Sequence, residues 1–174
     1  DHRGRGLQRR LNEELDHDLK KGGYDVAMIQ GIPGFYQRFG YEYAVPLENH
    51  VNVPLHAVPE GPSALCVRPV STEDIPWLLS EDAAYRRAFD ISVLRNEEDW
   101  HYLLTSSSET SYGSEWWVVE STEKVGAYFR VPREGFGQGL IVSEVSEGIT
   151  NEEFASALSF CRRLAEKRSK PYIR

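Results

Sequence analysis

Near its start the chain reads His2-Arg3-Gly4-Arg5-Gly6-Leu7-Gln8-Arg9-Arg10. The two glycines allow a tight backbone turn, so that successive N–H groups at a helix start point outward and can hold a phosphate. Four of these residues are arginines, which add positive charge beside the amides. The stretch therefore favours a diphosphate-bearing cofactor. The alternative is a basic helix start with a flexible glycine turn and no ligand.

Leucines recur every fourth residue after this turn, at positions 7, 11, 15 and 19. This period predicts an amphipathic helix over residues 6–21, and Gly22-Gly23 supplies its stop. Residues 24–30 are mostly apolar and predict a buried strand, which the breaker at residues 31–34 closes. Residues 35–39 then predict one or two helical turns that carry an aromatic cluster, with Gly40 as the stop.

The later part of the chain predicts a mixed α/β arrangement with strands and helices in alternation. The expected strands are 65–70, 116–120, 125–131, 140–145 and a last one beginning at 171. The expected helices are 71–87, 97–104 and 151–168, and two of them open with capping boxes, at residues 71–74 and 150–153. We expect the helices 6–21 and 151–168 each to pack on a sheet.

A segment rich in proline and glycine divides these two parts. Residues 56–62 contain two prolines and a glycine and offer little to bury, which is typical of a linker. The sequence therefore predicts a first segment over residues 1–55, a linker over 56–64 and a second segment over 65–174.

The composition and net charge argue against some classes of binding partner. The 174 residues carry 20 Lys+Arg and 27 Asp+Glu, a net charge of −7, and no run of Lys and Arg suits a nucleic-acid backbone. We therefore expect no nucleic-acid partner. No run of eighteen apolar residues suggests a membrane span, and the polar first residues do not resemble a signal peptide. We expect a cytoplasmic protein without a membrane partner.

Other residues with chemical potential give weaker signals. The five histidines lack metal-ligand spacing, so we expect no metal, and Cys66 and Cys161 are interpreted as reduced thiols. Glu144 and Glu147 lie at the end of a predicted strand, where one hypothesis makes one of them a general base. On so acidic a segment, solvated carboxylates are the favoured interpretation.

Residues 1–44 resemble the second half of a domain of the GNAT superfamily of N-acetyltransferases. That family binds the acetyl-CoA pyrophosphate with the pattern [QR]-x-x-G-x-[GA] before a helix, and here the pattern is matched except at its last position, where Gln8 replaces Gly or Ala. The resemblance implies an acetyl-CoA-binding set that consists of Arg3, Gly4, Arg5, Gly6, Leu7, Gln8 and Arg9.

The family often continues with a strand, a short helix containing a tyrosine, and Gly-Phe or Gly-Tyr. Phe35-Tyr36-Gln37-Arg38-Phe39-Gly40-Tyr41 follows that order here. By this resemblance Tyr36 is the catalytic residue that protonates the departing CoA thiolate, a transfer for which a phenol is a suitable acid.

The second segment resembles the beginning of the same family. Residues 67–75 are similar to its first strand and helix start, the hairpin through 125–128 to its second and third strands, and 140–145 to its fourth. Residues 144–150 are acidic where arginine and glycine belong, so this unit is not expected to bind CoA in the ordinary way. The order is that of a fragment: the end of one GNAT domain, a linker, and the first two-thirds of a degenerate one.

The resemblance implies an enzyme that moves an acetyl group from acetyl-CoA to a small primary amine or a peptide amine, without a metal. The alternative function is a non-catalytic GNAT-like module for assembly or acyl-CoA sensing. A half-domain exposes sheet edges, so we expect a homo-oligomer, or else pairing of the strand 140–145 with the strand 24–30 in one composite fold.

Overall fold

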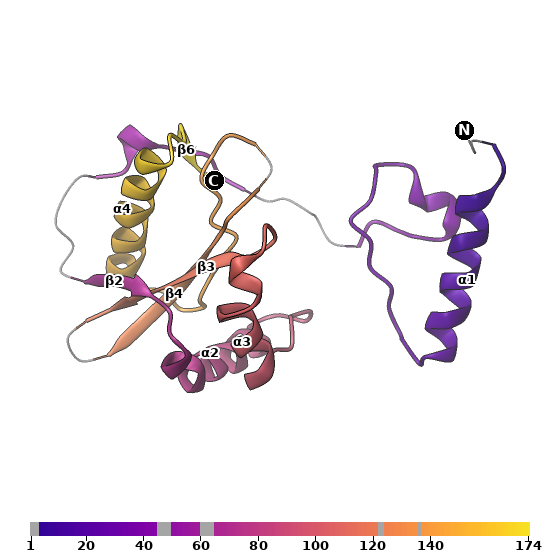
Figure 1. Ribbon diagram of the computed structural model, residues 1–174, viewed down its shortest axis with the longest axis horizontal. Coiled ribbons are helices and arrows are strands. Elements are labelled where there is room, and N and C mark those ends of the chain that lie inside the picture. Colours follow the sequence, from indigo (N-terminus) through magenta and orange to yellow (C-terminus); the bar gives the residue numbers. More distant parts are fainter. Residues whose placement is uncertain (1–3, 45–49, 60–64, 122–123, 136) are drawn as a thin grey trace. The chain divides into compact units, whose positions relative to one another are not determined.

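The computed structural model describes residues 4–44, 50–59, 65–121, 124–135 and 137–174. Contacts divide the chain into two units, Asp1–Asn49 and His50–Arg174. The first unit holds α1 (Leu7–Lys21) and the short 3-10 helix η1 (Tyr36–Phe39), and all described strands belong to the second unit (Figure 1).

Helix α1 confirms the helix predicted from the leucine period. It begins after Gly6, whose φ of 69° is left-handed, and ends where the Gly22 N–H donates to the Asp18 carbonyl at 2.8 Å. No residue of the helix is buried, and Leu11 is 65% exposed. The expected packing of this helix on a sheet is therefore wrong.

The strand predicted at residues 24–30 is also wrong. These residues have no regular secondary structure, and Val26 and Met28 are 73% and 74% exposed. A strand needs a neighbour to accept and donate its backbone hydrogen bonds, and the described part of the first unit contains no other strand. Without a neighbouring strand this apolar run therefore forms no strand, and its side chains stay exposed.

The helix predicted at residues 35–39 is confirmed, in the 3-10 form. Gly40 ends it in the left-handed conformation, with φ of 88°. The ring of Tyr36 lies 5.0 Å from that of Phe35 and 5.9 Å from that of Tyr41, both edge to face. With Phe39 these rings form the expected aromatic cluster.

The second unit is a mixed α/β fold around a four-stranded antiparallel sheet in the order β2-β3-β4-β5. The strands are β1 (Val53–Pro54), β2 (Cys66–Pro69), β3 (Ser114–Glu120), β4 (Val125–Pro132), β5 (Glu144–Val145) and β6 (Tyr172–Ile173). The helices are η2 (Leu55–Ala57), η3 (Thr72–Asp74), α2 (Ile75–Ala88), α3 (Glu97–Leu104), η4 (Ser107–Glu109) and α4 (Asn151–Lys167).

Helices cover both faces of this sheet (Figure 1). On one face Val119 and Phe129 pack with Cys161 of α4. On the other, Val118 and Tyr128 pack with the helices α2 and α3. Neighbouring residues of a strand point to opposite faces, so β3 and β4 supply both cores.

The segment 140–145 changes partners halfway along. Its first half runs parallel to β6, where the Leu140 N–H donates to the Tyr172 carbonyl at 2.8 Å. Its second half runs antiparallel to β4, where the Ser143 N–H donates to the Arg130 carbonyl at 3.0 Å. Both neighbours lie in the second unit, and the composite pairing expected with residues 24–30 is wrong because those residues form no strand.

Residues 53–58, expected at the end of the first segment and in the linker, belong to the second unit. Val53 pairs with Ile173 across β1 and β6, and Val58 is 2% exposed in the core beside α4. The Val58 carbonyl accepts from Arg162 of α4 at 2.7 Å. The prolines of this segment are typical of a linker, and the sequence pattern does not indicate which strand pairs with β1. Residues 60–64 of the expected linker lie outside the described residues.

The start of η3 and α2 is held by a charged contact. Arg68 donates to both carboxylate oxygens of Asp74 at 2.8 Å, and the Ser71 N–H also donates to Asp74, which completes the predicted capping box. The hydrogen bonds from Arg68 lower the pKa of Asp74 below its ordinary value of 3.8 although burial opposes this. The ionised carboxylate therefore stabilises the folded state.

Replacing this carboxylate tests that inference. Asp74→Asn should lower the free energy of unfolding by about 2 kcal/mol at pH 7. Because the pKa is lower in the folded state, the deficit should shrink as the pH falls below 3.8. All four tryptophans lie in the second unit, so urea unfolding followed by tryptophan fluorescence reports on it. The exposed neighbour Glu73→Gln is the control, and an equal loss there would contradict the inference.

Candidate functional site

The start of α1 has the geometry of an anion site. Gly4 and Gly6 are both left-handed, with φ of 74° and 69°. No side chain caps the helix and its first turn holds no acidic residue. The first N–H groups of a helix have no acceptor within the helix, and the positive end of the helix dipole lies beside them. This end of α1 therefore suits a negatively charged group.

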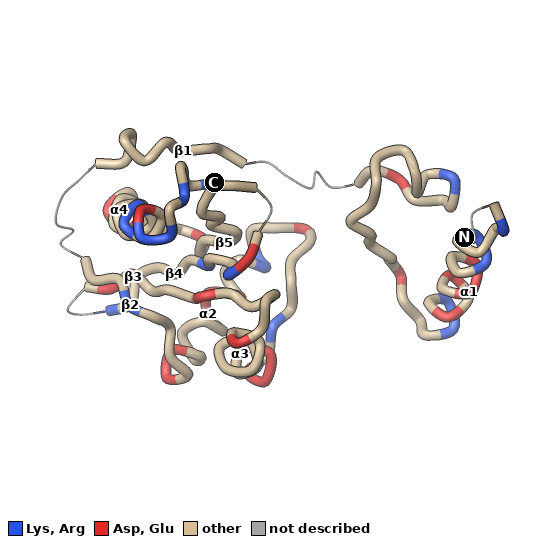
Figure 2. Tube along the Cα trace, turned by 45° about the horizontal axis from the view of Figure 1, so that its top comes forward, with Lys and Arg blue, Asp and Glu red and all other residues tan. Residues whose placement is uncertain are grey.

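The space in front of these glycines is open. A Cβ atom built on Gly4 or Gly6 would meet no atom within 4 Å. Glycine is thus required by the left-handed backbone and not by crowding. Leu7, Gln8 and Arg9 are exposed beside it. Figure 2 shows Lys and Arg at both ends of α1 with Asp and Glu between them. Arg3 of the predicted set lies outside the described residues.

Tyr36 lies against the backbone of the same unit. Its ring is so close to Gly31 that a Cβ there would come within 2.5 Å of it. Tyr36 is half-buried in the aromatic cluster with Phe35 and Tyr41. The close approach fixes the ring at the start of η1, where a side chain at position 31 would displace it.

A cavity of about 670 Å³ lies between α1 and the segment that follows Tyr36. Arg9 lines it from the helix, and Phe39, Gly40 and Tyr41 line it from the other side. It brings one residue of the predicted acetyl-CoA-binding set together with the segment after Tyr36. Neither Tyr36 nor residues 4–8 line it.

The second unit contains a buried ionic cluster that sequence patterns missed. Arg95 donates to both carboxylate oxygens of Glu144 at 2.8 Å and to Asp82 at 3.2 Å. Its guanidinium lies 5.0 Å from the ring centre of Trp100 and 5.5 Å from that of Trp116. Arg95 comes from a loop without periodicity, so only the tertiary structure brings it to the sheet.

Two further groups complete the cluster. The Trp100 indole N–H donates to Asp82 at 2.8 Å, and the Tyr128 hydroxyl donates to Glu144 at 2.8 Å. Burial raises the pKa of both Asp82 and Tyr128. Glu144 is therefore held in an internal network, which corrects its interpretation as a solvated carboxylate. Glu147 is exposed as expected.

The start of α4 differs from the start of α1. Thr150 and Glu153 form the predicted capping box: the Glu153 N–H donates to the Thr150 hydroxyl, and the Thr150 N–H donates to the Glu153 carboxylate at 2.8 Å. Glu152 adds a second negative charge to the first turn. One helix-start amide, that of Glu153, thus has an acceptor, and the two carboxylates of the first turn would repel an anion.

Among the described residues, no group of three or more His, Cys, Asp or Glu is arranged to hold a metal ion. In the same part of the chain, no helix is both long and apolar enough to cross a membrane.

Comparisons with known proteins concern residues 1–44 and the fold. Residues 1–44 match the family model described as acetyltransferase (GNAT) domain. The structure resembles that of a GCN5-related N-acetyltransferase from Anabaena variabilis, with a TM-score of 0.61, 15% identity and 99% of this chain covered. This chain spans 44% of that protein's length. A comparison with curated proteins finds no match.

Two other solved structures are more distant. A GNAT-family acetyltransferase from Streptococcus pneumoniae has a TM-score of 0.40 and 10% identity, covering 56% of this chain and 67% of its own. The C-terminal domain of a putative lysylphosphatidylglycerol synthetase from Agrobacterium fabrum has a TM-score of 0.40 and 11% identity, covering 70% and 44%. The family model and the Anabaena fold confirm the resemblance to the GNAT superfamily and its mixed α/β fold.

The buried cluster leads to a prediction about stability. Glu144→Gln should lower the free energy of unfolding by about 3 kcal/mol, because it removes the main partner of Arg95, whose side chain is only 11% exposed. Urea unfolding followed by tryptophan fluorescence measures the loss. Glu147→Gln, an exposed carboxamide substitution three residues away, should change it by less than about 0.5 kcal/mol. Equal stability of the two variants would contradict the role given to the cluster.

Proposed function

We propose that this protein is an N-acetyltransferase that moves an acetyl group from acetyl-CoA to a primary amine. The observation that carries the proposal is the start of α1. It is uncapped, left-handed at Gly6 and flanked by arginines, and it lies within the residues that match a GNAT domain. A diphosphate needs this combination of open amides and positive charge.

The proposed roles follow from the chain's own groups. The amides of residues 4–8 bind the pyrophosphate, and Arg5 and Arg9 add positive charge. Gln8, where the family usually has Gly or Ala, has an exposed side chain that leaves its amide accessible. When bound, acetyl-CoA supplies the acetyl thioester. The neutral amine attacks the thioester carbon directly, the carbon–sulfur bond breaks, and Tyr36 gives a proton to the sulfur that leaves. The nitrogen loses one proton to solvent, and the Tyr36 phenolate regains one from solvent.

A second candidate function is a non-catalytic module for assembly or acyl-CoA sensing. The observation in its favour is the absence of any strand among the described residues of the first unit, since residues 24–30 are uncovered. Both candidates use the phosphate-binding helix start, and they differ only in whether turnover follows binding.

Gly6→Val should abolish measurable CoA binding in calorimetry, because a side chain there obstructs the approach of the pyrophosphate to the amides. Gly23→Val is a matched control at the other end of α1: its φ is 74° and its Cβ would also meet no atom within 4 Å. The Gly23→Val variant carries the same backbone strain without facing the ligand, so it should bind CoA like the wild type.

Arg9→Ala should weaken CoA binding by less than about tenfold. Wild-type protein that gives no heat with millimolar CoA would contradict the site itself.

Tyr36→Phe separates the two candidate functions. The substitution keeps the ring against Gly31 and removes only the proton donor, so CoA affinity should stay the same while acetyl transfer slows. Release of free thiol from acetyl-CoA is measured with three kinds of amine: a polyamine, an aminoglycoside and a peptide N-terminus. If wild-type protein binds CoA but releases thiol with none of them, the non-catalytic module takes the place of the enzyme.

Self-association belongs to the same proposal. Leu11, Val26 and Met28 are each 65% exposed or more, and exposed apolar surface of this kind favours contact with another chain. Light scattering should give a mass above the 19.9 kDa of one chain. Val26→Asp should lower that mass, whereas Val51→Asp, at a position 75% exposed in the second unit, should not. A monomeric wild type would contradict the oligomer.

A further inference from the structure

The second unit contains a cavity that the proposed acetyltransferase chemistry does not use. It has a volume of about 390 Å³ and lies where β2 ends at Pro69 and β3 begins at Ser114. Leu104 of α3 lines it on one side, and Leu164 and Lys167 of α4 line it on the other. It therefore sits at the C-terminal end of α4, whereas the family's phosphate motif belongs before a helix start.

Part of the lining of this cavity is apolar and aromatic, and Ser108, Ser114 and Glu115 add polar groups to it. Trp116 and Trp117 line it together with Leu104 and Leu164. Trp116 is only 4% exposed and stacks edge to face on Trp100 at 4.9 Å. The indole N–H groups of Trp116 and Trp117 are buried without an acceptor among the described residues. Such walls favour an apolar molecular body over water.

The rim of the cavity is positively charged. Arg168 donates twice to the Glu115 carboxylate, at 2.6 and 2.7 Å, so these two charges are paired with each other. Arg133 and Lys167 also line the cavity, and within the described residues neither side chain has a hydrogen bond or an ion pair. Two cations thus remain available in a chain whose net charge is −7.

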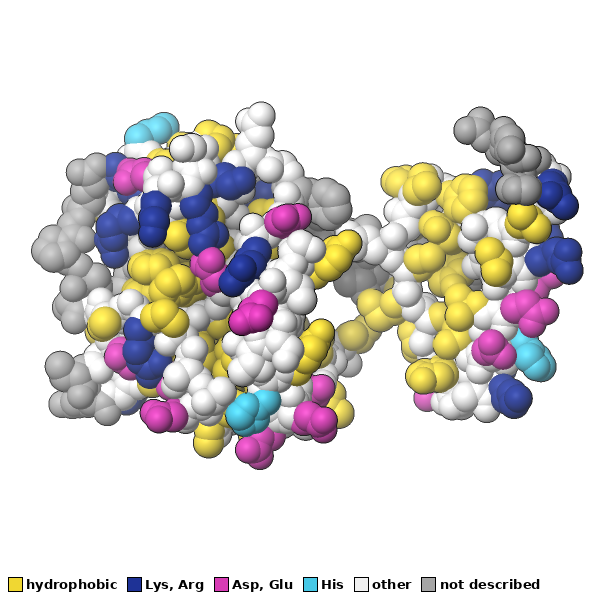
Figure 3. All heavy atoms as spheres, viewed as in Figure 1, with side chains coloured by type: hydrophobic (Ala, Val, Ile, Leu, Met, Phe, Trp, Pro, Cys, Tyr) yellow, Lys and Arg dark blue, Asp and Glu magenta, His cyan; other side chains and the backbone are white. Residues whose placement is uncertain are grey.

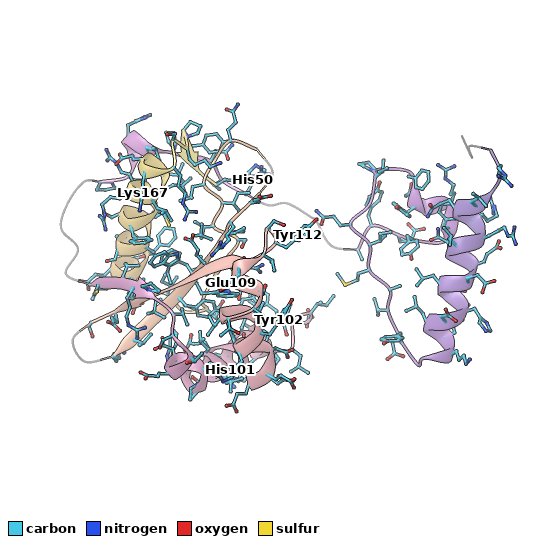
Figure 4. The ribbon with its side chains drawn as sticks, in the orientation of Figure 1. His50, His101, Tyr102, Glu109, Tyr112 and Lys167 are labelled. Atoms are coloured by element: carbon cyan, nitrogen blue, oxygen red, sulfur yellow. The ribbon has the colours of Figure 1, made fainter. Side chains whose placement is uncertain are left out.

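Figure 3 shows hydrophobic side chains gathered on the near face of the larger unit with Lys and Arg along their border. Figure 4 places Lys167 on α4, and Glu109 and Tyr112 on the segment between α3 and β3.

We propose that this cavity binds a small organic carboxylate with an apolar body. Lys167 and Arg133 hold the carboxylate, and the body lies against Trp117 and Leu164, which pack in the same core. A volume of about 390 Å³ falls in the range of small-molecule sites, and a few charged groups at the rim of an apolar pocket determine orientation and selectivity. Charge complementarity favours an anion over a neutral or cationic ligand of the same size.

Calorimetry on the whole chain with 2-naphthoate tests the proposal. The uncharged analogue 2-naphthylmethanol should bind at least tenfold more weakly, since it lacks the carboxylate. Lys167→Gln and Arg133→Gln should each weaken 2-naphthoate binding by about fivefold to tenfold. They should leave binding of the uncharged analogue unchanged, because the rim charges do not touch its apolar body.

Two control variants locate the site. Lys124→Gln removes one exposed positive charge at the β3–β4 hairpin, the opposite end of β3 from the cavity, and should not change 2-naphthoate binding. Gly6→Val should not change it either, so the proposal does not depend on CoA binding. No heat with millimolar 2-naphthoate would overturn the proposal, as would equal affinity for the two probes or unchanged affinity in the variant that lacks both Lys167 and Arg133.

Discussion

The alternation of side chains along β3 is the constraint on which the second unit depends. Trp116 and Val118 enter the core with α2 and α3, and Trp117 and Val119 face α4. One strand thus belongs to two cores, so a shift of its register by one residue would exchange every contact on both faces. The cavity at the start of β3 arises from the same arrangement: β2 ends at Pro69, and the two helical layers leave a space beside the exposed strand end.

The starts of the two helices α1 and α4 differ in their hydrogen bonds and in their charge. At α1 the amides are open, the backbone is left-handed and the charge is positive. At α4 the capping box gives the Glu153 N–H an acceptor, and Glu152 and Glu153 make the first turn negative. The helix dipole is the same in both. The few side chains before and within the first turn therefore determine whether the helix start favours an anion.

Charged side chains of the second unit lie in two kinds of environment. Arg95 is enclosed by Glu144, Asp82 and two tryptophan rings, where each carboxylate has a donor and the arginine connects a loop to the sheet. Lys167 and Arg133 stay at the surface without a partner among the described residues. Breaking a buried ion pair lowers the free energy of unfolding strongly. An unpaired cation beside an apolar wall can instead bind a ligand.

The sequence by itself determined the features that depend on neighbours along the chain. These are the leucine period of α1, its glycine stop, the capping boxes at residues 71–74 and 150–153, the β3–β4 hairpin and the aromatic turn around Tyr36. The motif that leads to the GNAT family is equally local. Each follows from backbone sterics or from hydrogen bonds within a few residues.

Only the tertiary structure decided the features that need a distant partner. The apolar segment 24–30 has the composition of a strand but no neighbour to bond with in its unit, and β1, which the prolines conceal, gains its place from β6. Arg95 meets Glu144 across 49 positions of sequence. Periodicity in a sequence indicates which face of an element is buried but not which distant residue it meets, and so the buried ionic cluster and the cavity beside β3 became visible only in the folded chain.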